Sequence, residues 1–214
     1  MKTNKLLLAS SLLVLAVVFA GCAKAPETEM KEAQASLEDA RNTAQADKWA
    51  SAEYQSAKTS LDNANAEVEA QNQRFALMRN FDKAKEMYAL AKADAAKAKQ
   101  AAVANKETAK NEANTKLQEA TTAIQAARDA LSKAPVTKDT RADIQLFTSD
   151  LDGLDQSLGE VRNMISSEDY TGASSKAATV TQQANDIATK LTEAAEKAAA
   201  KKGSKGMKGM KKGK

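Results

Sequence analysis

Apolar residues, most of them alanine, recur at alternating intervals of three and four along almost the whole chain from Met30 to Ala198. This spacing places them on one face of an α-helix, and its persistence over many heptads is typical of helices that pack in coiled-coil fashion. Within this stretch the only glycines are Gly153, Gly159 and Gly172. Aromatic residues make up only 4 % of the chain. A sheet protein needs glycines at its turns and aromatic or β-branched residues in its strands, and both are scarce here. The sequence therefore predicts an all-α fold.

The apolar spacing falls into two sets of three stretches, and the second set restarts after the polar residues 105–116. Residues 30–44 align with residues 117–131, which indicates an internal duplication. Three long amphipathic helices joined by short connections favour an antiparallel bundle. We therefore predict two tandem antiparallel three-helix bundles, spectrin-like in architecture and coiled-coil in packing, over residues 29–110 and 111–200.

Two short segments are expected to interrupt the helices. Pro135 predicts a break in the second bundle, because proline cannot continue a helix. The corresponding segment of the first bundle, residues 45–51, contains neither glycine nor proline, so a bent continuous helix is the alternative to a break there. Ser51 and Thr137 are good N-caps for the helices that follow.

No loop signal separates the two bundles, so residues 81–131 are expected to form one helix, with a slip of heptad phase between residues 109 and 117. The two cores differ. The second has a Leu/Ile/Val seam over residues 144–165 and is expected to be the more stable half, because burying these side chains contributes more than burying alanine. The first is expected to be mostly alanine, with these large groups: Trp49, Tyr54, Phe75, Phe81 and Tyr88.

The start of the chain reads as an export signal. Lys2 and Lys5 precede an apolar run over residues 6–20, which is short for a transmembrane helix but typical of a secretory signal. Phe19-Ala20-Gly21-Cys22 follows and resembles a bacterial lipobox, with Phe19 where leucine is usual. Cys22 is the chain's one cysteine. An ordinary signal peptide followed by an incidental cysteine is the alternative.

The lipobox resemblance implies how the protein is held. Residues 1–21 would be a lipoprotein signal peptide, and Cys22 would become the first mature residue, carrying a thioether diacylglycerol and an N-acyl chain. Two or more acyl chains give stable membrane anchoring. Residues 22–28 are expected to form a tether. Ala23 after the cysteine implies an outer-membrane lipoprotein that faces the periplasm, with the inner membrane as the alternative.

Two motifs carry a family resemblance. The segment Asp47-Lys48-Trp49-Ala50-Ser51-Ala52-Glu53-Tyr54 and the helix start Asn80-Phe81-Asp82-Lys83-Ala84 are similar to those of small bacterial envelope lipoproteins with a helical domain of unknown function. The resemblance covers about residues 22–104, and members often have proline at the position of Ser51. Some members add a peptidoglycan-binding module, which this sequence lacks. The resemblance implies an envelope location and no particular activity.

Composition excludes several kinds of chemistry. The chain has no histidine and a single cysteine, so it has no Ser-His or Cys-His nucleophile system and no imidazole metal site. Residues 150–155 (DLDGLD) depart from the spacing of a calcium loop and are expected to be a solvated acidic face. Trp49 with Tyr54 is expected to close the end of a bundle, a ligand clamp being the alternative. We expect no enzymatic activity, no cofactor and no metal.

The end of the chain, residues 201–214, is rich in lysine and glycine and contains no acid. Such a segment is expected to be a disordered polycation. In the envelope it would meet the phosphates of lipopolysaccharide or acidic peptidoglycan rather than nucleic acid. A solvated tail without a partner is the alternative. The predicted contact residues are Lys201, Lys202, Lys205, Lys208, Lys211, Lys212 and Lys214.

These features together predict a non-enzymatic, lipid-anchored cell-envelope protein that acts as a structural spacer or tether. Its anchor is Cys22 and its opposite end is the basic tail. A periplasmic adaptor, whose helical surface binds an envelope protein, is the alternative. A covalent link to peptidoglycan through Lys214, as in the murein lipoprotein, is a further alternative for the tail.

Overall fold

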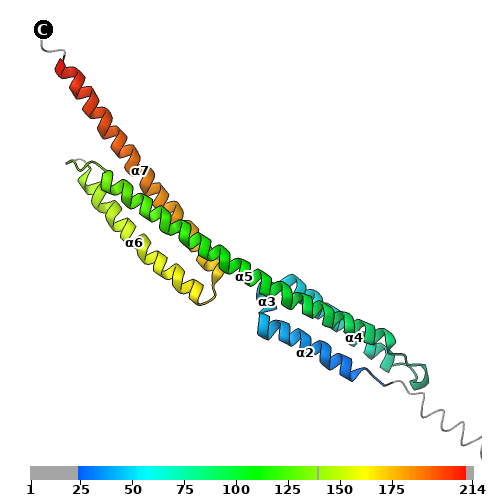
Figure 1. Ribbon diagram of the computed structural model, residues 1–214. Coiled ribbons are helices and arrows are strands. Elements are labelled where there is room, and N and C mark those ends of the chain that lie inside the picture. Colours follow the sequence, from blue (N-terminus) through cyan, green and yellow to red (C-terminus); the bar gives the residue numbers. More distant parts are fainter. Residues whose placement is uncertain (1–23, 139, 211–214) are drawn as a thin grey trace, which may run out of the picture. The chain divides into compact units, whose positions relative to one another are not determined.

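The structure is a computed structural model that describes residues 24–138 and 140–210. For residues 198 and 201–210 it describes the backbone alone. All regular structure in the described residues is helical, and no strand occurs among them. No helix in this part of the chain is long and apolar enough to cross a membrane. The elements are α2 (Glu27–Ala44), α3 (Ala46–Trp49), α4 (Ser51–Asn72), the short 3₁₀ helix η1 (Ala76–Met78), α5 (Asp82–Lys133), α6 (Arg141–Ser166) and α7 (Tyr170–Met210) (Figure 1).

The predicted all-helical fold is confirmed, and the chain divides into two compact units between Lys106 and Glu107. Residues 81–131 were expected to form one helix, and α5 confirms this as a single helix over Asp82–Lys133. The first part of α5 belongs to unit 1 and the rest to unit 2. Ala113, which is fully buried, lies within the segment where the slip of heptad phase was predicted.

In unit 1, α2 and α5 run in the same direction. Lys92 Nζ donates a hydrogen bond to Glu32 Oε2 at 2.8 Å, and Lys99 Nζ donates to Asp39 Oδ2 at 2.6 Å. In both pairs the residue on α5 follows its partner on α2 by 60 positions, as expected for two parallel helices. The two ion pairs hold the helices in a single register along their exposed edge.

The helix α4 lies beside α5 in the opposite direction. The hydroxyl of Tyr88 donates to Asn65 Oδ1 at 2.7 Å, and the hydroxyl of Ser60 donates to Asp94 Oδ2 at 2.8 Å. Later residues of α5 therefore meet earlier residues of α4. The three long helices of unit 1 alternate in direction along the chain.

The core of unit 1 is built mainly from alanine. Tyr88 and Phe81 are the most deeply buried large side chains among the described residues of unit 1, at 1 % and 3 % exposure. Small side chains allow helix axes to approach closely, since the interaxial distance follows the size of the residues at the contact. The buried residues form two clusters: Ala33, Leu61, Ala64, Tyr88 and Ala91 in one, and Ala40, Ala44, Ala46, Ala50, Ala98 and Ala102 in the other.

The break predicted over residues 45–51 is confirmed, and the alternative of a bent continuous helix is wrong. Gln45 adopts a left-handed conformation with φ 53°, and Ala50 leaves the helical region with φ −146° and ψ 53°. The predicted N-cap at Ser51 is also wrong. Ala50 occupies the cap position of α4, because the amide of Tyr54 donates to the Ala50 carbonyl at 2.9 Å.

The helix α6 begins at Arg141 with Thr140 in its cap position, so the predicted N-cap at Thr137 lies three residues too early, although Thr137 exchanges hydrogen bonds with Thr140. The amide of Thr140 donates to the Thr137 hydroxyl at 3.2 Å, and the amide of Thr137 donates to the Thr140 hydroxyl at 2.9 Å. This reciprocal arrangement satisfies two amides at the start of a helix, as a capping box does. The amide of Arg141 then bonds to the Thr137 carbonyl and begins α6.

Phe75 was expected in the core of unit 1, and this expectation is wrong. Its side chain is 70 % exposed, because α4 ends at Asn72 before the heptad spacing reaches it. Gln71, only 5 % exposed, closes that end of the unit instead. Its amide oxygen accepts from the backbone amide of Asn80 at 3.1 Å. Phe81 and Tyr88 are buried as predicted, whereas Trp49 and Tyr54 are half-buried.

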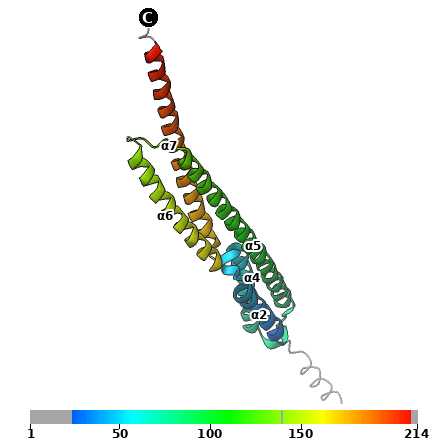
Figure 2. The ribbon, with the colours of Figure 1, turned by 60° about the vertical axis from the view of Figure 1, so that its left-hand side comes forward.

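Unit 2 consists of the remainder of α5 with α6 and α7, and α6 and α7 run in opposite directions (Figure 1 and Figure 2). Glu160 forms an ion pair with Lys176, while Phe147 and Leu191, farther from the connection, line one surface groove. The predicted Leu/Ile/Val seam is buried from Leu151 to Val161 and half-buried at its ends. The large buried side chains of unit 2 are Ile124, Leu151, Leu154, Leu158, Val161, Tyr170, Val180, Ile187 and Leu191.

At its start, α7 is capped by Asp169, whose carboxylate accepts the amide of Gly172 at 3.1 Å. A side chain at residue 172 would collide with that carboxylate, so glycine permits the cap. At its other end α7 extends to Met210 and so includes residues 201–210, which differs from the disorder predicted there. Alanine and lysine in residues 194–202 favour helix, and the helix continues although each later glycine costs about 1 kcal/mol relative to alanine. Residues 211–214 lie outside the described residues.

We predict that Ala95→Leu destabilises unit 1 by about 1–3 kcal/mol, because Ala95 is fully buried and a larger side chain must force the helices apart. The control Ala96→Leu adds the same group at an exposed position of the same helix and should change stability little. Chemical unfolding followed by fluorescence measures this, since Trp49, the one tryptophan, lies in unit 1. Equal midpoints for the two variants would contradict the close packing.

Candidate functional site

The predicted site residues fall where side chains are not described. Cys22 and the lipobox residues Phe19, Ala20 and Gly21 lie outside the described residues, as do Lys211, Lys212 and Lys214. Lys201, Lys202, Lys205 and Lys208 lie in the last turns of α7, and their side chains are likewise outside the description. The structure does describe the end of unit 1 that follows directly after Cys22.

That end of unit 1 brings together the start of α2 and the connection between α4 and α5 (Figure 1). Lys24 and Ala25 line a shallow surface cleft together with Asn72, Arg79 and Phe81. The first described residues of the chain thus lie against the α4–α5 connection. Any group attached at Cys22 is therefore connected to this end of the unit by a very short segment.

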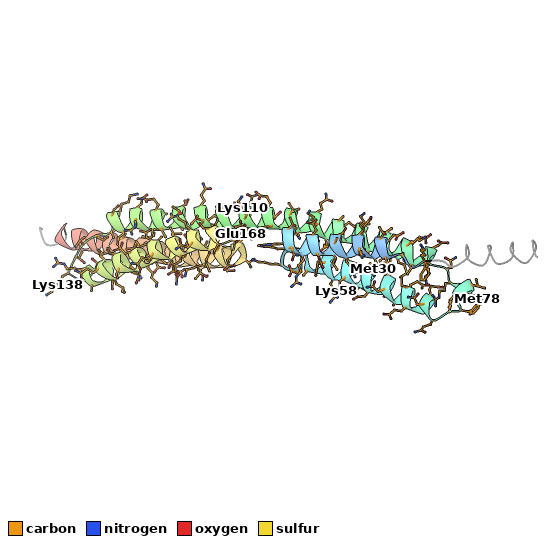
Figure 3. All side chains as sticks on the ribbon, turned by 90° about the horizontal axis from the view of Figure 1, so that it is seen from below. Met30, Lys58, Met78, Lys110, Lys138 and Glu168 are labelled. Carbon is orange, nitrogen blue, oxygen red and sulfur yellow. The ribbon has the colours of Figure 1, made fainter. Side chains whose placement is uncertain are left out.

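The α4–α5 connection presents three large apolar side chains to solvent. Phe75, Leu77 and Met78 are 70 %, 54 % and 72 % exposed. We call these three residues the apolar tip. Met78 lies at the extreme end of unit 1 in Figure 3. Arg74 and Arg79 flank the tip in the sequence.

Hydrogen bonds within the connection hold the apolar tip in place. Arg79 donates from Nε to the carbonyl of Arg74 at 3.1 Å and from Nη2 to the carbonyl of Asn72 at 2.8 Å. The amide of Met78 donates to the carbonyl of Phe75 at 2.8 Å. Because backbone groups of this connection are hydrogen-bonded within it, the tip is an ordered turn whose apolar side chains face solvent.

Sequence reasoning missed the apolar tip because it continued the heptad count through Phe75 and Met78. A signal was present, since polar pairs lie on both sides of it, Asn72-Gln73 before and Arg79-Asn80 after. Asparagine disfavours the helix interior and forms local side-chain bonds to the backbone. Asn80 does so here, and its side-chain oxygen accepts the amide of Asp82 at 2.8 Å.

The corner around Trp49 is a packed one, as predicted. The indole Nε1 donates to Gln45 Oε1 at 3.0 Å, and Lys48 Nζ lies 4.6 Å from the ring centroid. Asn105 Nδ2 of α5 donates to the Trp49 carbonyl at 2.8 Å. The ring packs against the alanine cluster of α2, α3 and α5. These contacts fasten the corner to α5.

Two acidic residues of α6, Asp152 and Asp155, contact an arginine. Arg128 of α5 donates from Nη2 to Asp152 Oδ1 at 2.8 Å and to Asp155 Oδ2 at 2.6 Å. The hydrogen bond to Asp152, followed by that to Asp155, raises the pKa of Arg128 above its ordinary value. Across the described residues, no group of three or more acids, cysteines or histidines is placed to hold a metal ion. The arginine joins α5 to α6 at the surface of unit 2.

Ion pairs at the surface of unit 1 shift two carboxyl pKa values. The hydrogen bond from Lys99, and then that from Thr43, lowers the pKa of Asp39. In the same way Lys83, followed by Gln71, lowers the pKa of Glu67. Elsewhere burial raises the pKa of the Tyr88 phenol, and the hydrogen bond to Glu119 raises the pKa of Lys116. These are the effects expected when a charged form is bonded to a partner or a polar group is buried.

Comparison with protein-family models, with curated proteins and with solved structures finds no match to this chain.

We predict that acidification weakens unit 1 in part through Asp39 and Glu67. Their pKa values are lower in the folded than in the unfolded state, so the stabilisation is present above the unfolded pKa and is lost as pH falls through the folded pKa. Asp39→Asn/Glu67→Gln should therefore show a smaller drop in unfolding midpoint between about pH 5 and pH 3. Urea unfolding followed by Trp49 fluorescence measures the drop.

The matched control is Glu38→Gln/Glu69→Gln, which removes one acid from each of the same two helices and leaves both ion pairs intact. It should keep the pH dependence of the unmodified chain. A slope that is equally reduced in both double variants would show that overall charge, rather than the two pairs, causes the effect.

Proposed function

We propose that this chain is a lipid-anchored, non-enzymatic protein of the bacterial cell envelope that acts as a structural spacer or tether. Its membrane attachment is the lipid on Cys22, in the outer membrane and facing the periplasm. Its basic tail, residues 201–214, contacts an anionic surface such as lipopolysaccharide or peptidoglycan. The resemblance to small envelope lipoproteins supports the same location.

The observation that carries the proposal is Cys22 itself. It is the chain's one cysteine, and it stands directly after Phe19-Ala20-Gly21 and an apolar run of signal-peptide length. The short interval between Cys22 and α2, which begins at Glu27, supports attachment close to the folded part. Two or more acyl chains at this position give an anchor that does not depend on any further contact.

The architecture we propose for the spacer is two tandem antiparallel three-helix bundles of the spectrin type that share α5. The pairing of α2 and α4 with the first part of α5 supports the first bundle. The contacts of α6 with α7, and those of Arg128 on α5 with α6, support the second. Helices held by heptad seams over many turns are suited to keeping a fixed length between two attachment points.

One observation favours a second candidate, the periplasmic adaptor. Ile144 and Phe147 of α6 are only half-buried, and with Leu191 of α7 they line a surface groove of about 400 Å³. The charged residues Lys190, Glu193 and Lys197 also line it. A groove with apolar and charged lining residues is able to take an apolar side chain of a partner protein. The spacer remains our proposal because Cys22 accounts for the location.

We predict that Cys22→Ala abolishes lipid attachment. Cells grown with an alkyne-tagged fatty acid should label the unmodified protein and leave Cys22→Ala unlabelled, with residues 1–21 still attached. The control Ala25→Ser changes the tether and should be labelled and processed normally. Label on Cys22→Ala, or an unlabelled natural protein, would contradict the proposal.

The same cells test the tail. After a high-salt wash, the protein that lacks residues 201–214 should stay with the membrane, because acyl anchoring is insensitive to salt. Its retention by isolated peptidoglycan or by lipopolysaccharide vesicles at low salt should fall, since contacts of exposed lysines are screened by ions. Equal retention with and without these residues would remove the tail from the proposed function.

A further inference from the structure

We propose that the apolar tip, Phe75, Leu77 and Met78, inserts into the interface of the same membrane that holds the lipid anchor. The ligand is a phospholipid bilayer with anionic headgroups. This inference rests on the proposed function, because it takes the lipid at Cys22 as given. It adds a second membrane contact, made by side chains of the folded unit.

The three side chains of the apolar tip are exposed together. Single exposed apolar side chains are common on protein surfaces, whereas a contiguous group marks a contact with a partner or a membrane. Phe75, Leu77 and Met78 lie within one short turn, and each is more than half exposed. The other exposed large apolar residues of the described part are ten or more residues apart in the sequence: Leu90, Val103, Val136 and Leu146.

Internal hydrogen bonds hold the turn in a conformation that presents these side chains to solvent. The two hydrogen bonds from Arg79 to backbone carbonyls, and that between Met78 and Phe75, satisfy polar groups of the turn internally. The buried Gln71 bonds to the amide of Asn80 and closes the core behind it. Backbone groups that are already bonded can approach a bilayer at lower cost, since unsatisfied ones are expensive to remove from water.

The apolar tip lies at the end of unit 1 where the described chain begins. Lys24 and Ala25 line a cleft with Arg79 and Phe81, so the chain enters unit 1 beside the tip. Cys22 precedes Lys24 by two residues, and two peptide units span at most about 8 Å between Cα atoms. A lipid on Cys22 therefore holds the membrane surface close to the α4–α5 connection. Figure 3 places Met78 at this end of unit 1.

The chemistry of the segment fits an interface. Aromatic and aliphatic side chains bury in the boundary between headgroups and acyl chains, while arginine keeps its charge among the phosphates. Residues 74–79 (RFALMR) have this order, with an arginine on either side of the apolar residues. The anchor also makes a weak contact sufficient, because a tethered group meets the membrane at a high effective concentration.

The test uses the full, lipid-modified protein in vesicles of phosphatidylethanolamine and phosphatidylglycerol, with and without brominated acyl chains. Phe75→Trp in a Trp49→Phe background places the one tryptophan in the tip. Bromine quenches tryptophan that enters the bilayer, so we expect fluorescence to fall at least twofold. The matched control is Val103→Trp in the same background, 57 % exposed and near the end of unit 1 opposite the tip, which should not be quenched.

A further variant separates insertion from mere proximity. Phe75→Trp combined with Leu77→Ser and Met78→Ser keeps the probe and the anchor but removes the other apolar side chains. Quenching should fall by at least half. These positions are exposed, so the fold should be retained, and circular dichroism checks this.

The outcomes distinguish the two proposals. Protein that floats with the vesicles but is not quenched at residue 75 overturns the tip and leaves the anchor intact. Protein that does not float overturns the anchor, and the tip with it. The emission of the tryptophan at residue 75 could instead shift to the blue as protein concentration rises, without quenching by brominated lipid. That result would show contact between two copies of the protein and would also overturn the inference.

Discussion

Close approach of helices along alanine seams is the constraint on which the rest of unit 1 depends. Ala40, Ala64 and Ala98 are completely buried at the contacts, and the ion pairs at the edges form because the helices lie near one another. Each buried alanine contributes little apolar area, so stability must come from many contacts over long, continuous helices. Alanine also has the highest helix propensity, which favours that continuity. Unit 2 instead buries Leu151, Leu158 and other large side chains, and depends less on this constraint.

Much of the fold was predictable because heptad spacing is set by helix geometry. It correctly indicated helices throughout, a break over residues 45–51 and one helix over residues 81–131. It failed at helix ends. A heptad count does not say where a helix stops, so Phe75 was placed in the core although α4 ends at Asn72. Ser51 failed as a cap because the turn at Gln45 and α3 place Ala50 there instead.

The candidate site was predictable only in part. Cys22 and the tail lysines follow from sequence motifs and remain predictions, since they lie outside the described side chains. The apolar tip follows from three-dimensional structure, because only the position of the turn shows that Phe75, Leu77 and Met78 face solvent. Lys24 and Ala25, which follow shortly after Cys22, lie against the α4–α5 connection that carries the apolar tip. Anchor and tip there give a consistent account of how one end of the protein is held.

The central claim of this account is that the mature protein begins at a lipid-modified Cys22. The intact mass of the protein purified from envelope membranes, followed by fragmentation of its first peptide, tests this most directly. The account predicts a chain without residues 1–21, whose first residue carries the mass of a diacylglyceryl group and a further acyl chain. A mature chain with an unmodified cysteine at position 22, or one cleaved at another position, would contradict it.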